Sequence, residues 1–502
     1  PLVRIHNLKE LQDNIFTLPR EALLMHIRRN NVSRWLGSRA LFPIAEFLKK
    51  ITWQSLQDVD KHRQIIYDAI VAYRRMKNQG VVAVFHRERF DHFSNFARIG
   101  DGSLGGKGRG LAFLDHIIKK HADLNSFEQL PVMIPKTVVL CTDVFDEFME
   151  RNDLYATALS NASDEEILCA FINAHLPQRL EEDFRCLVDV VKGPLAIRSS
   201  SLLEDAHYQP FAGIYSTYMI PPAKDTEERL EMLANAIKAV YASVFYKDSK
   251  AYMTATSNVI DQEKMAVIIQ EVVGQAHETR FYPHISGVAR SVNYYPVDDQ
   301  KAEDGIVNMA LGLGKYIVDG GENLRVDPYI PKKIMQLSEM ELALRETQTR
   351  FLALDLSQTK LDFKTDDGFN LLNLSVRQAD KDGVLKWLCS TFDPYDQIIQ
   401  YDVLPLARVL QKILEYGSKE MMRPVEIEFA CTVNDNKTGE FYLLQIRPMV
   451  DNKIMLDEDL DAVSDNELIL RSESAIGHGI MSDIHDLVYV KTDDYSASMN
   501  IE

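Results

Sequence analysis

The sequence predicts a mixed helical and stranded fold of the α+β class, with a helical segment at its N-terminus. Residues 1–95 carry apolar side chains at helical spacing, whereas strand-like runs alternate with helical patterns from about residue 96 to residue 330. Two further strand-like runs, residues 424–433 and 441–449, are separated by a turn sequence and close the folded body. The same alternation is compatible with an α/β arrangement, which the pattern leaves open.

Composition excludes several classes of protein. The chain has 502 residues, of which 46% are hydrophobic, and this predicts about two to four domains with substantial cores. It lacks an apolar run of about 18 residues and a signal-peptide core, so we expect a cytoplasmic protein without a membrane span. The five cysteines form no CxxC pair, which argues against a disulfide framework or a zinc site. A formal charge of −18 disfavours a broad nucleic-acid-binding surface.

The N-terminal segment is predicted to contain three helices. Apolar residues recur three and four positions apart in residues 8–29, 33–50 and 59–76, and Gly80 is a suitable stop. The segment is rich in arginine, as in HIRRNN and YRRMKN. We interpret these arginines as a solvated charged face, with a phosphate or partner site as the alternative.

A glycine-rich stretch, DGSLGGKGRG at residues 101–110, opens the central region. Glycine lets the backbone approach a ligand closely, so several N–H groups could point at one anion around Lys107. The helical pattern that follows would place such a phosphate near a helix N-terminus. The spacing differs from a Walker loop, and a lone GxGxxG match is weak. A flexible connector is the alternative interpretation.

The elements between this loop and the end of the body follow from short apolar runs and longer periodic segments. Short runs predict strands at residues 137–141, 194–200, 265–273, 286–294 and 305–314. Periodic segments predict helices at residues 164–174, 178–191 and 226–253. Helical patterns dominate again from about residue 331 to residue 420, including residues 334–352 and 405–416.

Alternation along the closing hairpin, residues 424–449, separates an apolar face from a polar one. A turn that is symmetric about its Asn-Lys dipeptide places Glu428 opposite Gln445. The same register places Glu426 opposite Arg447. The residues predicted to face the core are Val425, Ile427 and Phe429 on the first strand and Tyr442, Leu444 and Ile446 on the second.

The polar face of this hairpin suits a divalent cation together with a phosphate. A carboxylate and an amide oxygen are ligands that Mg²⁺ accepts, and an arginine can bind the anion through two N–H groups. The hairpin by itself is equally compatible with a surface ladder in which Glu426 and Arg447 form a weak ion pair.

Two other predicted strands carry polar residues that could bind a nucleotide. In IRSSSLLED, Arg198 lies at a strand end before serines and an acidic pair, an arrangement that suits phosphate oxygens. In MAVIIQEVV, the polar pair Gln270 and Glu271 interrupts an apolar strand that could offer backbone groups to a purine edge. Each has a structural alternative, because a strand-end arginine has many uses and a buried strand can simply reach the surface.

The order of these blocks is similar to that of a known family. GGKGRGLAFL, PLAIRSSSLLEDAHYQPFAGIYSTY, MAVIIQEVV, SGVARSVNYYP, ALGLGKYIVDGG and VEIEFACTV with FYLLQIRPM follow one another along the chain. Over residues 96–450 the series resembles the nucleotide-binding half of the pyruvate phosphate dikinase and phosphoenolpyruvate synthase family, which has an ATP-grasp fold. Members of this family bind MgATP between two lobes and phosphorylate a histidine on a mobile domain.

The local patterns and the resemblance together predict four parts, of which the N-terminal segment has no counterpart in the family core. Residues 1–95 would be a helical N-terminal segment, residues 96–255 the first lobe of a two-lobed ATP-grasp fold, and residues 256–450 the second lobe with a helical insertion. Residues 451–502 would be a linker and the start of a further domain.

The resemblance also implies roles for individual residues. Lys107, Arg198 and Arg447 would be catalytic, because they would contact the phosphates and the transferring phosphoryl group. Glu428 and Gln445 would hold Mg²⁺. The residues implied for binding ATP are Gly105, Gly106, Lys107, Arg198, Thr217, Gln270, Glu271 and Val273.

The chain also departs from the family pattern. The GLGE block reads GLGK, so that Lys315 replaces an acid, and SGVARSVNYYP is one residue longer than usual. No phosphocarrier motif is found, and His478, the nearest candidate histidine, is better interpreted as an ordinary turn residue.

Two functions follow from the resemblance. The first is an ATP-dependent phosphotransferase module whose histidine acceptor is supplied by a missing segment or by another protein. The alternative is a non-catalytic ATP-sensing regulatory module with the N-terminal helices as its partner surface. Retention of the cationic and metal-binding residues favours the first function, whereas Lys315 and the missing acceptor favour the second.

Overall fold

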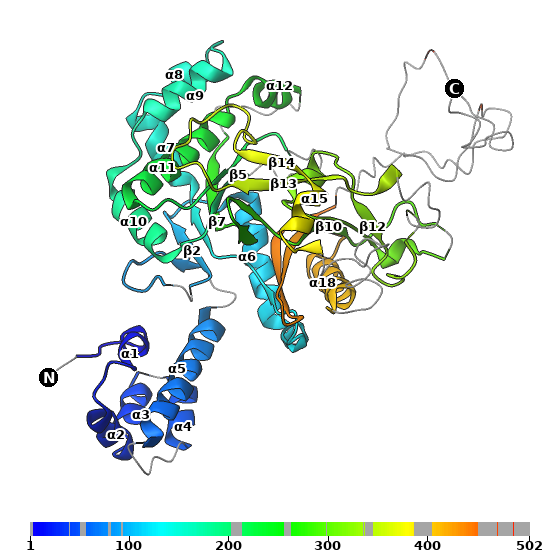
Figure 1. The fold of residues 1–502 in the computed structure, drawn as a ribbon. Helices are drawn as coiled ribbons and strands as arrows, with labels where there is room; N and C mark the ends of the chain where they lie inside the picture. The colour runs from blue at the N-terminus through cyan, green and yellow to red at the C-terminus, as the bar shows by residue number, and fades with distance from the viewer. Residues whose placement is uncertain are drawn as a thin grey trace. The chain divides into compact units, whose positions relative to one another are not determined.

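The structure is a computed structural model of the 502-residue chain (Figure 1). It describes residues 4–39, 41–50, 57–78, 82–91, 94–201, 213–255, 263–297, 299–334, 336, 345–385 and 404–449, together with residues 469 and 485. The chain divides into two compact units, Pro1–Met449 and Val450–Glu502, and every element named below belongs to the first. The predicted linker at 451–502, including His478, otherwise lies outside the described residues.

The N-terminal segment is helical, as predicted, but its helices are shorter than the sequence pattern suggested. Its described helices are α1 (Leu8–Asn14), α2 (Arg20–Arg28), α3 (Asn31–Gly37), α4 (Phe42–Lys50) and α5 (Gln57–Asn78). The predicted helix at 8–29 is split before α2, where Pro19 disfavours helical backbone at Leu18. The helices bury an apolar cluster of their own, which includes Leu36 and Ile66.

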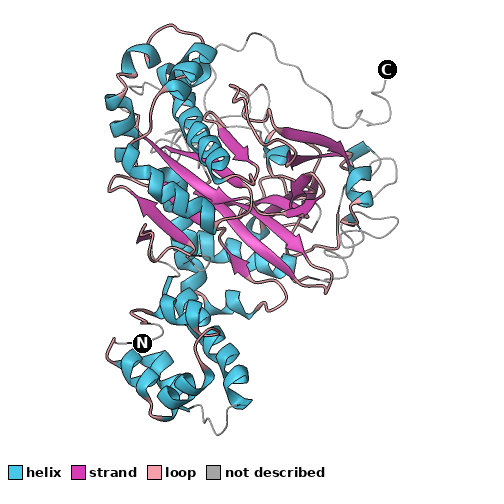
Figure 2. Ribbon diagram, turned by 60° about the vertical axis from the view of Figure 1, so that its left-hand side comes forward, coloured by secondary structure: helices cyan, strands magenta, loops and turns pink. Residues whose placement is uncertain are grey.

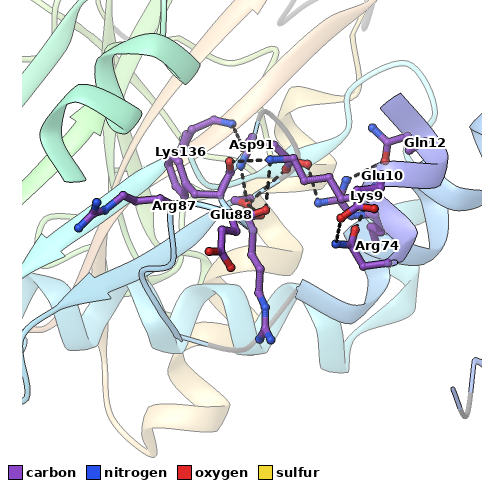
Figure 3. A network of polar contacts seen from close by, with 12 residues as sticks. Lys9, Glu10, Gln12, Arg74, Arg87, Glu88, Asp91 and Lys136 are labelled. Atoms are coloured by element: carbon purple, nitrogen blue, oxygen red, sulfur yellow. Dashed lines mark hydrogen bonds and ion pairs between the residues drawn. The ribbon is translucent and has the colours of Figure 1, made fainter. Parts of the chain in front are cut away.

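Polar side chains connect these helices to residues 82–91, the segment that follows them. Arg74 in α5 forms an ion pair with Asp91 at 2.5 Å and donates a hydrogen bond to Gln12 Oε1 in α1 at 2.8 Å (Figure 3). Lys136 Nζ donates to the carbonyl oxygen of Asp91 at 3.0 Å. The Arg74 and Asp91 side chains are only 11% and 6% exposed, so breaking this pair would leave a buried charge without its partner.

The first large sheet has the strand order β1-β2-β4-β7-β5-β6. The strand bounds are Ala83–Val84, Phe96–Ile99, Thr137–Leu140, Met265–Glu271, Leu195–Ser201 and Thr217–Ile220, in that order. Strand β7 is buried along almost its whole length, as its apolar sequence predicts for a central strand. On one face of β7, Met265, Val267 and Ile269 share a core with helices α7 (Thr142–Arg151), α9 (Asp164–Asn173), α10 (Glu181–Val190) and α11 (Thr226–Ser243) (Figure 1). Ala266 and Ile268, on the other face, belong to the core of the second large sheet.

The second large sheet has the order β12-β11-β10-β15-β16-β3. Its strands are Leu324–Val326, Ile306–Ala310, Ile285–Arg290, Val425–Val433, Gly439–Pro448 and Val132–Met133. Helices α6 (Gly105–Lys120) and α18 (Leu406–Met421) pack against it and complete its core. A smaller sheet has the order β14-β13-β9-β8, formed by Leu371–Ser375, Arg350–Asp355, Arg280–Tyr282 and Gln275–His277.

Short helices complete the described part of the body, in which the strands are gathered with helices packed around them (Figure 2). These are α8 (Tyr155–Ala158), α12 (Lys247–Ala255), α13 (Lys315–Val318) and α15 (Val376–Lys381), with 3₁₀ turns at Ala122–Ser126, Gln178–Leu180 and Ala302–Asp304. In the described ranges no helix combines the length and the apolar character needed to span a membrane.

The observed content confirms the α+β class, but the predicted helical stretch at 331–420 is partly wrong. The predicted helix at 334–352 conflicts with strand β13, which begins at Arg350, whereas the helix predicted at 405–416 is confirmed by α18. Strand β13 pairs with β9 on one side and β14 on the other, and Phe351 in it is fully buried. Pairing between strands distant in sequence has overridden the local helical pattern here.

The sheets do not follow the lobe boundary proposed at residue 255. Strand β7, which follows that boundary, lies in the middle of the first sheet between β4 and β5. Strand β3, which precedes it, lies at the edge of the second sheet beside β16. The chain therefore passes more than once between the two sheets, and the residues facing both sheets come from distant parts of the sequence.

Candidate functional site

Arg198 connects the two large sheets. It lies on β5 in the first sheet, and its Nη2 donates hydrogen bonds to Glu428 Oε2 at 3.1 Å and to Gln445 Oε1 at 2.9 Å in the second. Its Nη1 donates to the carbonyl oxygen of Leu444 at 3.0 Å. The Arg198 side chain is 13% exposed and that of Glu428 is 26% exposed, so this cluster lies close to the surface between the sheets.

The register predicted for the polar residues of the hairpin is confirmed. Glu428 lies opposite Gln445 and Glu426 lies opposite Arg447. This brings a carboxylate and an amide oxygen to the same nitrogen of Arg198. The guanidinium group therefore holds the two oxygens that the sequence suggested as Mg²⁺ ligands close together.

A β-bulge makes this register possible. The register shifts between Glu428 and Phe429, because Phe429 pairs with Leu443 and leaves Leu444 as an additional residue on β16. The prediction that Tyr442 and Leu444 face the core was therefore wrong. Phe441 and Leu443 are fully buried instead, and the carbonyl group of Leu444 accepts its hydrogen bond from Arg198.

A second polar row lies beside the first on the same face of the sheet. Arg290 on β10 pairs with Glu426 on β15, which pairs in turn with Arg447 on β16. Glu426 Oε2 accepts from Arg290 Nε at 2.7 Å, and Glu426 Oε1 accepts from Arg447 Nε at 2.8 Å and also from its Nη2. Burial opposes ionisation of Glu426, but the two guanidinium groups outweigh it, so its pKa lies below the usual value.

The two polar residues of β7 have different environments. Gln270 is 3% exposed, and its amide oxygen accepts from Arg198 Nη1 at 3.3 Å while its amide nitrogen donates to Thr137 Oγ1 at 3.0 Å. Its side chain therefore supports Arg198. Glu271 is the next residue along the strand, and burial raises the pKa of its carboxyl group. Val273, just beyond the strand, is 8% exposed.

The glycine-rich stretch is half loop and half helix. Helix α6 begins at Gly105, so Gly106 and Lys107 lie in its first turn. Lys107 Nζ donates to the carbonyl and hydroxyl oxygens of Ser199, both at 3.1 Å. The expected phosphate-binding lysine thus lies beside the residue that follows Arg198 on β5.

The loop before α6 is fixed by α7. The backbone N–H groups of Asp101 and Gly102 donate to the Asp143 carboxylate at 3.1 and 2.9 Å, and that of Ser103 donates to Thr142 Oγ1 at 3.0 Å. These three N–H groups were expected to be available to an anion, but in this conformation they bind protein side chains. In the first turn of α6, the N–H groups of Gly105 and Gly108 also donate to side chains, to Ser103 Oγ at 3.1 Å and to Ser200 Oγ at 3.0 Å. The turn therefore offers an anion fewer N–H groups than its position suggests.

Two glycines of α6 are required by close packing. Gly105 has a φ of +67°, and a Cβ there would lie 1.7 Å from the carbonyl oxygen of Ser200. A Cβ at Gly110 would lie 2.7 Å from the carbonyl oxygen of Ile446. The glycines therefore let α6 approach a strand of each large sheet, a role that the sequence did not suggest.

Thr217 lies beside Arg198, and its backbone is bound by Asp367. It pairs with Arg198 across β5 and β6, and its backbone N–H donates to Asp367 Oδ2 at 2.7 Å. Asp367 Oδ1 lies 3.2 Å from Lys315 Nζ. Lys315, the residue that departs from the family pattern, is thus part of a link to the strand beside Arg198.

The structure brings together most of the residues that the sequence singled out and adds several that it missed. Thr137, Asp367 and the Leu444 carbonyl group each contact a predicted site residue. Arg290 binds Glu426, which in turn binds the predicted residue Arg447. The sequence offered one usable signal, since Arg290 occupies a polar position in the predicted strand SGVARSVNY. Within the described ranges, no group of three or more His, Cys, Asp or Glu side chains is arranged to hold a metal.

Comparison with known proteins gives one family match and several distant relatives. A family model described as pyruvate phosphate dikinase, AMP/ATP-binding domain, matches residues 101–463. The chain is similar to an uncharacterized phosphotransferase, YvkC, of Bacillus subtilis, with 25% identity over 342 residues, or 68% of this chain and 34% of that protein.

Two further relatives are both named as phosphoenolpyruvate synthases. A phosphoenolpyruvate synthase of Aeropyrum pernix is 27% identical over 267 residues, covering 52% of this chain and 29% of that protein. A probable phosphoenolpyruvate synthase of Pyrococcus abyssi is 25% identical over 308 residues, covering 60% and 32%. The chain thus spans about a third of the length of the curated relatives that it matches.

Proposed function

The chain belongs to the family of pyruvate phosphate dikinase AMP/ATP-binding domains, and from this premise we propose that it binds MgATP and donates a phosphoryl group to a histidine not identified in this chain. The observation that carries the proposal is the position of Arg198, which joins Glu428 and Gln445 across the two large sheets. In this proposal the two sheets belong to the two lobes of an ATP-grasp fold, with the nucleotide between them.

Cations from both sheets would bind the phosphates. Arg198 approaches from β5 in the first sheet, Lys107 from helix α6, and Arg447 from β16 in the second sheet. Phosphoryl transfer depends mostly on positioning and on neutralising charge, which these three side chains supply. In the transfer, a phosphorus–oxygen bond of ATP breaks and a phosphorus–nitrogen bond to the acceptor histidine forms.

Glu428 and Gln445 would hold Mg²⁺. Their side-chain oxygens converge on a single cationic nitrogen of Arg198, which supports a positively charged ligand at this position. Because the pair supplies only one carboxylate, most of the coordination would come from phosphate oxygens and water, as is usual for Mg²⁺. When bound, Mg²⁺ would stabilise negative charge that develops on the phosphate oxygens.

The remaining predicted residues would enclose the nucleotide. Gly106 would offer its backbone N–H group at the start of α6, and Gly105 would do so if its N–H group released Ser103 Oγ. Thr217 would line the site beside Arg198. Glu271 and Val273 would lie along the adenine ring. Gln270 would act through Arg198, because its amide already binds that guanidinium group.

A non-catalytic ATP-sensing module is the second candidate. It is favoured by the observation that the loop N–H groups of Asp101 and Gly102 are bound to Asp143. A module of this kind would bind ATP and change shape without turnover, and the N-terminal helices would present its partner surface.

Radiolabelled ATP separates the two candidates. The chain would be incubated with MgATP and with a histidine-carrying domain from a longer form of the protein or from a partner. Phosphotransferase function predicts acid-labile, base-stable labelling of that domain, which Glu428→Gln should abolish. Binding of MgATP by the wild-type chain without any labelled acceptor would support the sensing module, and failure to bind MgATP would contradict both.

A further inference from the structure

The row formed by Arg290, Glu426 and Arg447 places two cationic side chains around one buried carboxylate. The carboxylate of Glu426 binds one guanidinium group on each of its oxygens, so that the two arginines lie on either side of it. Side-chain exposure is 9% for Glu426, 28% for Arg447 and 42% for Arg290. The carboxylate is therefore at the base of the cluster, and the cationic groups reach outward from it.

Charge and hydrogen bonding both leave this cluster able to bind an anion. Two guanidinium groups and one carboxylate carry a net charge of about +1, since arginine is always protonated. Arg290 uses Nε on Glu426, and among the described residues neither of its Nη atoms has a hydrogen-bond partner. A planar fork with unused N–H groups beside a second arginine suits the oxygens of a phosphate.

The position of the cluster points to the same ligand as the proposed site. Glu426 and Glu428 are two residues apart on β15, so their side chains share one face, about 7 Å apart along the strand. Glu428 is bound to Arg198 in the adjacent row. The phosphate chain of a nucleoside triphosphate can span this separation.

We propose that Arg290 is a second phosphate-binding arginine beside Arg447, and that Glu426 positions both for the outermost phosphates of ATP. This inference rests on the proposed nucleotide site. Glu426 itself does not touch the ligand, because both of its oxygens are bound to the arginines. A buried carboxylate placed beside an anion would otherwise oppose binding by charge repulsion.

Titration calorimetry with ATP and with AMP tests the role of Arg290. Arg290→Gln is expected to weaken MgATP binding about tenfold, the effect of losing one charge-assisted contact, and to change AMP binding less than twofold. Arg350→Gln is the control, since Arg350 is likewise a strand arginine but is exposed and lies on the smaller sheet. Equal effects on ATP and AMP, or no effect on either, would overturn the proposal.

Glu426→Gln tests positioning against simple charge. If Glu426 acted only through its charge, its removal would strengthen ATP binding, because it repels the phosphates. Positioning predicts the opposite result, a weaker affinity for ATP with AMP binding retained. Unchanged or stronger ATP binding would overturn the positioning role.

The folded state of Glu426→Gln would be checked by a thermal melt. If this variant does not fold, Arg290→Gln is compared with Arg290→Lys instead. This comparison tests whether the guanidinium shape matters, since lysine keeps the charge but lacks the planar fork. Arg290→Lys should recover only part of the ATP affinity that Arg290→Gln loses. Full recovery would contradict the claim that the planar guanidinium group binds the phosphate. Binding of MgATP by the wild-type chain distinguishes failure of this inference from failure of the proposed function. If the wild-type chain does not bind MgATP, the proposed function is refuted rather than the role of Arg290.

Discussion

The guanidinium group of Arg198 is hydrogen-bonded to the carbonyl oxygen of Leu444 at 3.0 Å, and this contact depends on the bulge at Leu444. In a regular hairpin that carbonyl group would take part in the ladder between β15 and β16. Arg198 belongs to the first large sheet and Leu444 to the second. A local irregularity in one sheet thus provides an acceptor for the other.

Loss of Arg198 should affect both stability and binding. Arg198→Ala would leave Glu428 and Gln445 without their shared donor, at a cost of about 2 kcal/mol in the free energy of unfolding. It should also weaken MgATP binding. Lys107→Ala should weaken binding with a smaller loss of stability, because the two hydrogen bonds of Lys107 to Ser199 are made to neutral oxygens and not to a carboxylate. Urea unfolding and calorimetry measure the two effects, and equal destabilisation by both substitutions would refute this distinction.

Deletion of Leu444 should straighten the hairpin while keeping its polar pairs. Phe429 already pairs with Leu443 and Glu428 with Gln445, so removal of the bulged residue leaves both pairs in register. Arg198 would lose its carbonyl acceptor, and ATP affinity should fall. Deletion of Asn436 in the turn is the control, since it shortens the loop without touching the bulge. A crystal structure in which Gln445 had moved to the core face would show the prediction to be wrong.

Gly105→Ala should be strongly destabilising because its cost has two parts. A non-glycine residue at a φ of +67° costs about 1 kcal/mol, and the new Cβ would collide with the backbone of Ser200. Gly320→Ala isolates the first part, since Gly320 has a φ of +84° and nothing within 4 Å of a new Cβ. We expect Gly105→Ala to lower the free energy of unfolding by at least about 2 kcal/mol more than Gly320→Ala. If the two substitutions lowered the free energy of unfolding by similar amounts, α6 would pack less closely against Ser200 than it does in the structure.

Glu426 and Glu271 should give opposite pH dependences of stability. The folded pKa of Glu426 is lowered, so its contribution is present above its unfolded pKa of about 4.3 and is lost as the pH falls through the folded value. The folded pKa of Glu271 is raised, so ionisation destabilises the fold as the pH rises above about 4.3. Glu426→Gln should therefore destabilise at neutral pH and Glu271→Gln should stabilise.

The free energy of unfolding, measured between acid and neutral pH, checks these two pH dependences. The difference between each variant and the wild-type chain should shrink at acid pH, where both carboxyl groups are protonated in either state. A Glu271→Gln variant that is less stable than the wild-type chain at neutral pH would contradict the burial of that group.

Much of the fold could be predicted from local patterns. The strands at β4, β5, β7 and β10 and the helix α18 lie where the sequence placed them, because alternation and helical periodicity report which face of one segment is buried. Strands β13 and β14 were missed, since their pairing with β9 and with each other involves partners that a local window does not contain.

The sequence by itself determined which hairpin residues are polar and that Glu428 faces Gln445. Only the tertiary structure decided that an additional residue at Leu444 underlies this register, that Gln270 supports Arg198, and that Arg290 joins Arg447 on Glu426. The physical reason is the range of the interactions. Side-chain periodicity is set by the geometry of one element, whereas a hydrogen bond between sheets depends on how the whole chain brings distant strands together.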